Sequence, residues 1–425
     1  MLKRISVSDL ELGMFVHKME GSWFSHPFWK SKFVIDDPAK LDALRDSDLD
    51  GVVIDTSKGK DIAANPAPRI VAPLPATART GQSPPARRRA VAARSMVEGA
   101  SLLPVSAEIE MHAAQAIANK AQKAVQNTFI AARLGKAINV SAVQPVVTDI
   151  MDSIRRNPQA FGGLMRCKLK NEVIYQHALA VSALMISLAR QMKLTQAETR
   201  EAGLAGLMLD IGTNYLPQNA EVPHHDYRHA DPKIWQQHVM LGYRALQNDD
   251  TLPKAVLSAC LEHHERVDGQ GYPNGLAKGQ ISTIGRMAAI CDTFDFMMTR
   301  SGQGEALDPA VAVQRLRGME GAFDEEILRS FIESVGLYPV GSFVELRSGR
   351  IAMVTDEDPR DKARPVVQAF YSREQQERIV PHKVTLAQPD CKDAITGLAD
   401  LTGLDLPEEA QLRELVFFTA YKIAV

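Results

Sequence analysis

The sequence predicts a mostly α-helical protein flanked by two small β-rich units. Between residues 105 and 337, apolar residues recur at intervals of three and four, as in residues 173–188, and this spacing is typical of one helix face. Residues 1–60 and 338–425 contain short stretches in which apolar and polar residues alternate, which indicates β-strands. Residues 61–104 are rich in Pro, Ala and Arg and offer little surface to bury, so we expect a linker there.

The same patterns place the individual elements along the chain. In the N-terminal unit we expect strands near Ile5 and at residues 14–17, 33–35 and 52–54, with a short helix at 38–45. The central region predicts helices at 109–134, 173–188, 197–209, 234–247, 253–264, 284–299 and 325–335. The C-terminal unit predicts a hairpin of strands 342–347 and 350–355, a strand at 366–371 and a final helix near 407–419.

Composition and charge argue against a nucleic-acid-binding, secreted or membrane-spanning protein. The chain has 425 residues, 24% of them charged, and a formal net charge of -2, so it lacks the basic field that a nucleic-acid polymer attracts. Arg87, Arg88 and Arg89 are interpreted as solvated linker charges. We find neither a signal peptide nor an apolar run long enough to span a membrane. The four cysteines are widely separated, which favours a reducing, cytoplasmic setting.

Histidines and aspartates on separate predicted helices are the candidate functional residues. They are His177, Asp210, His238, His263, His264 and Asp292. A mixed set of imidazoles and carboxylates suits Mn, Fe or Zn, and an aspartate can bridge two such metals. Each residue alone has an ordinary explanation, since His177 suits a satisfied core histidine and Asp210 suits a helix cap. The adjacent imidazoles of His263 and His264 are harder to explain by packing.

The residues after this histidine pair carry a recognisable motif. The string HHERVDGQGYP at residues 263–273 resembles the HHExxDGxGYP signature of the HD-GYP family. Three further strings match the family in order: YQHALAV around His177, HVMLG at His238, and RMAAICDTFD around Asp292. The resemblance covers about residues 130–335. The first 60 residues resemble the small domain that often precedes HD-GYP domains, and the tail resembles their β appendage.

This resemblance implies an HD-type helical metal-binding domain and a set of roles. It implies that His177, Asp210 and Asp292 hold one metal, and that Asp210, as the catalytic residue, bridges to a second metal held by His238, His263 and His264. At most two divalent metals are expected, Fe or Mn first, with Zn, Mg or Ni as alternatives. The implied loop near the substrate or a partner consists of Arg266, Asp268, Gly269, Gly271, Tyr272 and Pro273. The implied reaction is hydrolysis of cyclic di-GMP to pGpG or GMP.

The chain departs from the family pattern at positions that matter for catalysis. Leu209 stands where the family has the histidine of its His-Asp pair, and Thr213 replaces a lysine. The RPYR string expected after Asp292 is absent near Arg300. Two hypotheses follow: a weakened phosphodiesterase, or a catalytically silent module that binds cyclic di-GMP or a protein such as a GGDEF-domain partner. His224, His225 or His229 is a candidate replacement for the missing imidazole.

Overall fold

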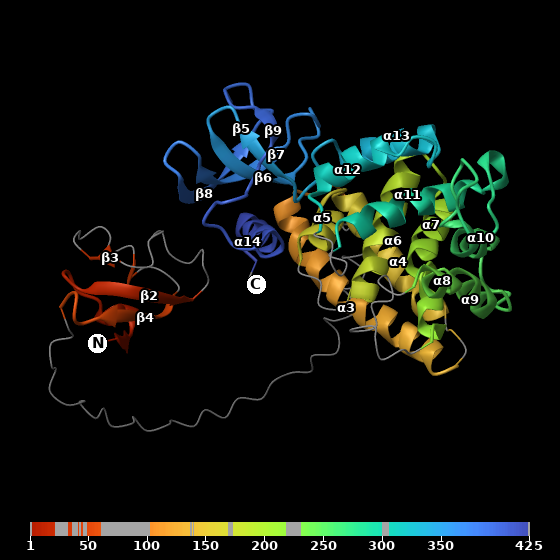
Figure 1. Ribbon diagram of the computed structural model, residues 1–425, viewed down its shortest axis with the longest axis horizontal. Coiled ribbons are helices and arrows are strands. Elements are labelled where there is room, and N and C mark those ends of the chain that lie inside the picture. Colours follow the sequence, from red (N-terminus) through yellow and green to blue (C-terminus); the bar gives the residue numbers. More distant parts are fainter. Residues whose placement is uncertain are drawn as a thin grey trace, which may run out of the picture. The chain divides into compact units, whose positions relative to one another are not determined.

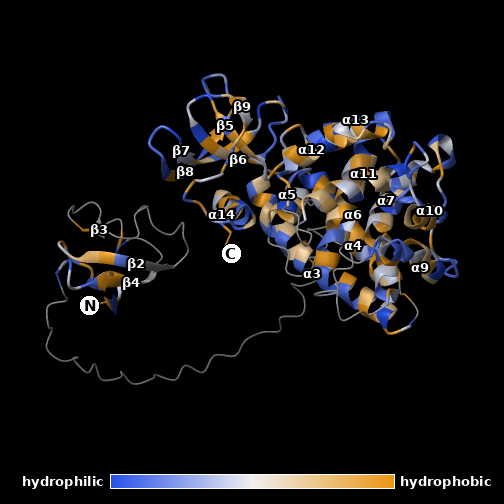
Figure 2. Cartoon of the chain, in the orientation of Figure 1, coloured by the Kyte–Doolittle hydropathy of each residue, from blue (hydrophilic) through white to orange (hydrophobic). Residues whose placement is uncertain are grey.

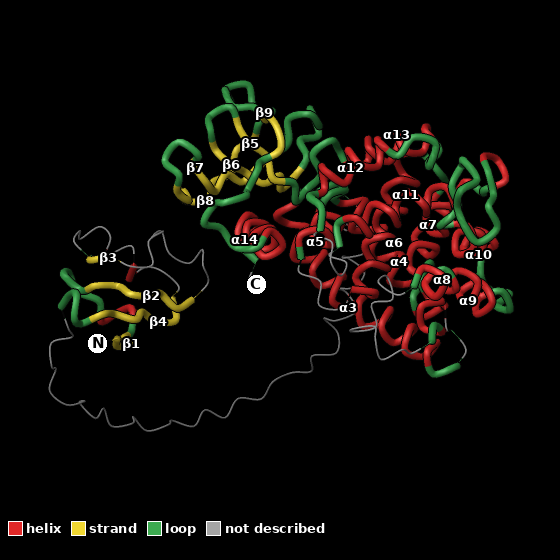
Figure 3. Tube along the Cα trace, in the orientation of Figure 1, coloured by secondary structure: helices red, strands yellow, loops and turns green. Residues whose placement is uncertain are grey.

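The computed structural model describes residues 2–21, 33–35, 41, 44–45, 49–60, 103–136, 138, 140–168, 173–217, 231–299 and 306–423. Most of the predicted linker, the expected helix at 38–45 apart from three residues, Arg87 to Arg89, the three loop histidines and Arg300 lie outside these residues. Figure 1 shows strands at both ends of the chain and a helical region between them, and Figure 3 shows the same division by element type. The protein is therefore mostly α-helical with small β units, as the sequence predicts.

The N-terminal unit is an antiparallel sheet. Its strands are β1 (Leu2–Ile5), β2 (Phe15–Gly21), β3 (Phe33–Val34) and β4 (Leu49–Asp55), in the order β1-β4-β2-β3. A 3-10 turn, η1 (Val7–Asp9), follows β1. Leu10, Met14, Val16, Ile35 and Ile54 are fully buried and form the centre of its small core. This unit has its own hydrophobic core.

The helical region contains eleven described α-helices and three described 3-10 turns. The helices are α3 (Ala107–Arg133), α4 (Gln144–Arg156), α5 (Ala160–Cys167), α6 (Val173–Gln191), α7 (Gln196–Met208), α8 (Pro232–Trp235), α9 (Gln237–Leu246), α10 (Lys254–Glu262), α11 (Thr283–Met297), α12 (Pro309–Gly318) and α13 (Glu325–Val335). The turns are η2 (Val140–Ala142), η3 (Ile211–Tyr215) and η6 (Lys278–Gln280). The sequence pattern did not resolve α4 and α5 as separate helices, because short helices give few periods to recognise.

Helix α6 is the central element of this region. It is buried almost continuously from Gln176 to Ala189, so its apolar composition serves packing on all sides. It is the one described helix with the length and hydropathy that a membrane span requires, and 72% of its most apolar window is buried inside the protein. Figure 2 shows hydrophobic residues recurring along α6 and its neighbours.

Helix α7 packs against α6 at very short range. Its start is fixed by a capping box, in which the Thr195 hydroxyl accepts the Glu198 N–H at 3.2 Å and Glu198 accepts the Thr195 N–H at 2.7 Å. Gly203 and Gly206 face α6, and Ser182 donates a hydrogen bond to the Gly203 carbonyl at 2.8 Å. Because these glycines have no side chain, the two backbones approach closely, which places Asp210 at the end of α7 near His177 on α6.

The C-terminal sheet has the order β8-β7-β6-β5-β9. Its strands are β5 (Phe343–Leu346), β6 (Arg350–Asp356), β7 (Val366–Ser372), β8 (Glu377–Thr385) and β9 (Ile395–Leu398), followed by α14 (Glu409–Tyr421). The expected hairpin, third strand and final helix are present. The edge strands β8 and β9 were not predicted, because they are only partly buried and lack a clear alternation of apolar and polar residues. The domain boundaries at residues 60, 104 and 337 stay predictions.

The close contact of α6 and α7 makes Gly206 sensitive to substitution. A Cβ atom at this position would lie 2.7 Å from the backbone nitrogen and Cα of Ser182. We expect Gly206→Ala to lower the free energy of unfolding by about 1–3 kcal/mol, because neither backbone can move without disturbing the core. Urea unfolding followed by circular dichroism measures this. Gly318→Ala is the control, since nothing lies within 4 Å of its added Cβ and it should be neutral or slightly stabilising. Equal effects of the two substitutions would contradict this account.

Two neighbouring aspartates at the end of β6 should have opposite effects on pH-dependent stability. Burial raises the pKa of Asp356 to about 6, whereas a hydrogen bond from Arg360 lowers the pKa of Asp358 to about 2. An unfolded Asp titrates near pH 3.9, so the folded protein binds the Asp356 proton more tightly and loses that stability as pH rises from about 4 to about 6. Asp356→Asn should therefore raise the Tm at pH 7.5 and leave it almost unchanged at pH 3.5.

The matched variant Asp358→Asn should lower the Tm at pH 7.5, because its carboxylate stabilises the fold above the unfolded pKa. Thermal unfolding at the two pH values, monitored by circular dichroism, measures both shifts. A Tm change of the same sign for both variants at pH 7.5 would rule out burial as the cause of the Asp356 pKa.

Candidate metal centre

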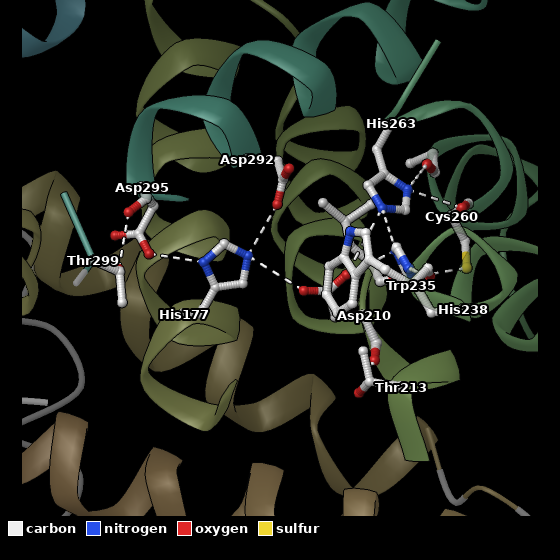
Figure 4. Close-up of polar contacts among 12 residues, drawn as sticks. His177, Asp210, Thr213, Trp235, His238, Cys260, His263, Asp292, Asp295 and Thr299 are labelled. Carbon is white, nitrogen blue, oxygen red and sulfur yellow. Dashed lines mark hydrogen bonds and ion pairs between the residues drawn. The ribbon is translucent and has the colours of Figure 1, made fainter. Parts of the chain in front are cut away.

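The first part of the site forms around His177, near the start of α6. Its Nδ1 donates a hydrogen bond to Asp295 Oδ2 at 2.8 Å. Its Nε2 lies 2.9 Å from Asp292 Oδ1 and 3.4 Å from Asp210 Oδ2 (Figure 4). Asp292 and Asp295 are three residues apart on α11, so both carboxylates project from one face of that helix. The imidazole is thereby surrounded by three carboxylates.

Asp210 lies between the two halves of the site. It follows α7 and begins η3, and it is buried. One carboxylate oxygen faces His177, and the other lies 3.3 Å from His238 Nε2 and 3.7 Å from His263 Nε2. Because its two oxygens point to different imidazole groups, Asp210 has the position that a bridging ligand requires.

The second part of the site is a cluster of three imidazoles. His238 on α9 donates its Nδ1–H to the carbonyl of Trp235 at 2.6 Å, and His263, at the end of α10, donates its Nδ1–H to the carbonyl of Cys260 at 2.9 Å. These bonds leave both Nε2 atoms as lone-pair acceptors. The two Nε2 atoms lie 3.2 Å apart. Two facing lone pairs at that distance repel each other unless a cation lies between or beside them.

His264 completes this cluster. Its ring stacks on Tyr272 with the centroids 4.6 Å apart and an interplanar angle of 22°. Its Nε2 is buried and has no hydrogen-bond partner among the described residues. A buried nitrogen without a partner costs free energy, and a bound cation or an ordered water molecule would offset that cost. The geometry of the imidazoles therefore fits a divalent cation.

The pKa values of the two parts differ in direction. Burial alone disfavours a charged His177, but hydrogen bonds to Asp292 and Asp295 outweigh it and raise the His177 pKa to about 10. Burial lowers the pKa of His238 to about 4, and burial together with neighbouring imidazoles lowers the pKa of His264 well below its usual range. The histidine cluster is thus neutral at pH 7, which is the form that binds metal.

Ligand atoms converge in two groups among the described residues: His177, Asp210 and Asp292, and His238, His263 and His264. Within each group the ligand atoms lie within 4.8 Å of one another. All six residues from the sequence analysis are therefore brought together, in the same two sets. Their role as metal ligands stays a prediction.

Close backbone packing holds the two groups in place. A Cβ atom at Gly212 would collide with the carbonyl of His238 and the backbone nitrogen of Gly242, so only glycine lets η3 lie against α9. This contact fixes the spacing between Asp210, two residues earlier, and His238. A Cβ at Gly271 would likewise collide with the backbone of Glu265 and Arg266, which closes the loop after the histidine pair.

The loop at residues 265–276 is built around a buried carboxylate. Glu265 accepts the N–H of Asn274 at 2.7 Å and the N–H of Leu276 at 2.9 Å. Arg266 pairs with Asp268 at 2.6 Å, and Gly269 has a φ of +78°, a conformation that favours glycine. Tyr272 returns to the site through its ring contact with His264 and its N–H bond to the His264 carbonyl. Within the loop, Tyr272 thus contacts the histidine cluster, whereas Arg266 and Asp268 pair with each other.

The two departures from the family pattern are both buried. Leu209 has 1% exposure, and its carbonyl accepts a weak bond from the Cys260 thiol at 3.5 Å. The Thr213 hydroxyl donates to the carbonyl of Asp210 at 2.7 Å, so it stabilises η3 and supplies no positive charge. The candidate replacement histidines at 224, 225 and 229 lie outside the described residues.

The sequence analysis assigned no role to three residues that have clear roles here. Asp295 could have been found from its spacing, because it follows Asp292 by three residues on the same helix face. Glu265 was part of the recognised motif, but its role as a loop anchor depends on a fold that the string does not show. Trp235 gave no sequence signal, since its contact with His238 depends on a turn between α8 and α9.

Residues 163–327 match the model of the HD domain, and residues 2–143 match a model described as a domain of unknown function. Fold and site together define a helical metal-centre protein of the HD type. A cyclic di-GMP phosphodiesterase of Pseudomonas aeruginosa is 38% identical over 400 residues, which cover 93% of this chain and 92% of that protein. The chain belongs to the HD-GYP family.

More distant relatives match less than half of this chain. A cyclic di-GMP phosphodiesterase of Thermotoga maritima is 27% identical over 37% of this chain and 44% of its own length. A 3'3'-cGAMP-specific phosphodiesterase of Vibrio cholerae is 25% identical over 40% of this chain and 39% of its own length. The names of these relatives therefore include two cyclic dinucleotides, cyclic di-GMP and 3'3'-cGAMP.

The Glu265 anchor generates a prediction about loop order. Glu265→Ala removes both acceptors of the Asn274 and Leu276 amides, and hydrogen bonds to a charged group are each worth about 1.5–3 kcal/mol. We expect faster amide hydrogen exchange across residues 266–276, measured by mass spectrometry. Glu265→Gln keeps one carbonyl acceptor and should show a smaller increase. Exchange unchanged from the parent protein in Glu265→Ala would show that the loop is held by other contacts.

Proposed function

We propose that this protein is a metal-dependent phosphodiesterase that hydrolyses cyclic di-GMP. One observation carries the proposal: two groups of ligand atoms, one at His177 and one at the histidine cluster, converge on either side of Asp210. The relative from Pseudomonas aeruginosa, which this chain matches over nearly its whole length, is named for this activity. The proposal accounts for the buried imidazole nitrogens, which a purely structural helical domain does not need.

In this proposal His177, Asp210 and Asp292 hold one divalent cation, and Asp210, His238, His263 and His264 hold a second. Two such cations polarise a phosphodiester and lower the pKa of water, so that attack becomes feasible at neutral pH. Mixed imidazole and carboxylate donors support Fe or Mn, with Zn, Mg or Ni as alternatives. Val173 stands where a family subgroup with three metals has glutamate, so we propose no more than two.

The chain's own residues orient these ligands. Asp295 accepts the Nδ1–H of His177 and thereby directs its Nε2 toward Asp210 and Asp292. Backbone carbonyls do the same for His238 and His263. Asp210, the proposed catalytic residue, holds its two oxygens toward both groups. The loop that contains Arg266, Asp268, Gly269, Gly271, Tyr272 and Pro273 borders the histidine cluster through Tyr272 and is proposed to contact the substrate or a partner.

Turnover should be slower than in a relative with an intact His-Asp pair. Leu209 cannot ligate a metal, and Thr213 uses its hydroxyl to bond the Asp210 carbonyl and supplies no cation. Both losses affect the half of the site around His177, where the described ligands are one imidazole and two carboxylates. Because each 1.36 kcal/mol of lost transition-state stabilisation costs about tenfold in rate, two losses reduce turnover substantially.

The same two residues favour a second candidate function. A chain that retains the histidine cluster and the ordered loop can bind cyclic di-GMP, or a partner such as a GGDEF-domain protein, without turning the nucleotide over. The ordered pairing of Arg266 with Asp268 would preserve such a recognition surface in the absence of catalysis. The 3'3'-cGAMP-specific relative adds a second cyclic dinucleotide that must be assayed beside cyclic di-GMP.

Metal content and product formation test these alternatives. Protein purified without chelator is analysed for metal by elemental mass spectrometry, then loaded with Mn or Fe and incubated with each cyclic dinucleotide, and the products are separated by liquid chromatography. We expect two metals per chain, slow formation of pGpG or GMP, and no product from Asp210→Asn. His264→Ala should lose metal. Binding of the nucleotide without any product would favour the second candidate, and no binding would exclude both.

The role of Leu209 has its own variant in this experiment. Leu209→His restores an imidazole and should raise metal occupancy, together with turnover by roughly 10-fold or more. Leu209→Ala is the control, because it opens the same space without supplying a ligand. A gain in Leu209→Ala equal to that in Leu209→His would show that space, rather than a ligand, limits the site.

A further inference from the structure

Trp235 lies at the histidine cluster, and its side chain has no role in the proposed hydrolysis. It is the last residue of the short helix α8, and its carbonyl accepts the His238 Nδ1–H. Its indole also packs on the His238 imidazole, with the ring centroids 4.2 Å apart and an interplanar angle of 38°. Figure 4 shows the indole beside His238. A large aromatic surface therefore borders the place where the substrate phosphate must bind.

Trp235 and Tyr272 are both half-buried, but their rings contact the histidine cluster in different ways. Tyr272 lies nearly parallel to His264, so one face of its ring is fully engaged. Trp235 is tilted against its histidine, and the next two residues, Gln236 and Gln237, are exposed. A tryptophan that only fixed the position of His238 would not need a ring this large, because the carbonyl bond already does so.

We propose that Trp235 stacks on a guanine base of the bound cyclic dinucleotide. This inference rests on the proposed function, and it adds a base-recognition residue to a site otherwise built for phosphate and metal. Every purine has a flat π face, and an indole offers the largest complementary surface among side chains.

Intrinsic fluorescence tests the proposal without relying on catalysis. The chain has three tryptophans, so the double variant W23F/W29F leaves Trp235 as the sole emitter. This protein is titrated with cyclic di-GMP, with dimethyl phosphate as a phosphodiester that lacks a base, and with correction for nucleotide absorption. We expect cyclic di-GMP to quench the emission and dimethyl phosphate to leave it unchanged.

Affinity measurements provide the matched variants. In equilibrium dialysis, Trp235→Ala should bind cyclic di-GMP roughly 5- to 150-fold more weakly, the loss that corresponds to one base stack. Trp235→Phe keeps an aromatic face and should lose less. Metal content is measured in each variant, because retained metal in Trp235→Ala shows that the weaker binding does not act through His238.

Four outcomes overturn the proposal. Cyclic di-GMP binding, proven by dialysis, without a change in Trp235 emission would show that no base stacks there while leaving the proposed function intact. Full retention of affinity for cyclic di-GMP in Trp235→Ala leads to the same conclusion. So does a loss of metal in Trp235→Ala that parallels its loss of nucleotide, together with unquenched emission in the W23F/W29F protein. Failure of the unsubstituted protein to bind cyclic di-GMP at all would remove the proposed function and this inference together.

Discussion

The direction in which each imidazole presents its free nitrogen is the constraint on which this site depends. His238 and His263 both donate Nδ1–H to backbone carbonyls, and His177 donates its Nδ1–H to the buried carboxylate of Asp295. In each case the opposite nitrogen, Nε2, is directed toward Asp210, so the convergence of these groups is built into the fold itself. The acceptors are the carbonyls of Trp235 and Cys260, near the ends of α8 and α10, and the carboxylate of Asp295 on α11. Local hydrogen bonds therefore orient all three imidazoles.

Backbone packing provides the precision that these hydrogen bonds require. The glycines at 206 and 212 allow α7 and η3 to touch α6 and α9 directly, and Asp210 lies between those two contacts. Larger residues at either position would separate the elements by the size of a side chain. The aspartate could then not reach both His177 and His238. The lack of a side chain at Gly206 and Gly212 therefore contributes to the geometry of the site as much as the polar residues do.

Much of this arrangement could be predicted from the sequence, for identifiable reasons. Long helices such as α3 and α6 show several periods of apolar residues, and the motif from His263 to Pro273 fixes the order of the ligand positions. Short elements such as α5 and β9 have too few residues to show a period. Asp295 and Trp235 escaped notice because their roles arise from contacts between helices, which no local pattern encodes.

The run His263, His264 and Glu265 joins the metal centre to the loop through three consecutive residues. His263 faces Asp210, His264 holds Tyr272, and Glu265 holds the amides of Asn274 and Leu276. Because the three residues are consecutive, a backbone displacement at His263 or His264 also displaces Glu265. Rearrangement of the imidazoles would therefore be transmitted to the outer loop, so that a spectroscopic label placed on that loop would report the state of a centre that is itself hidden from solvent.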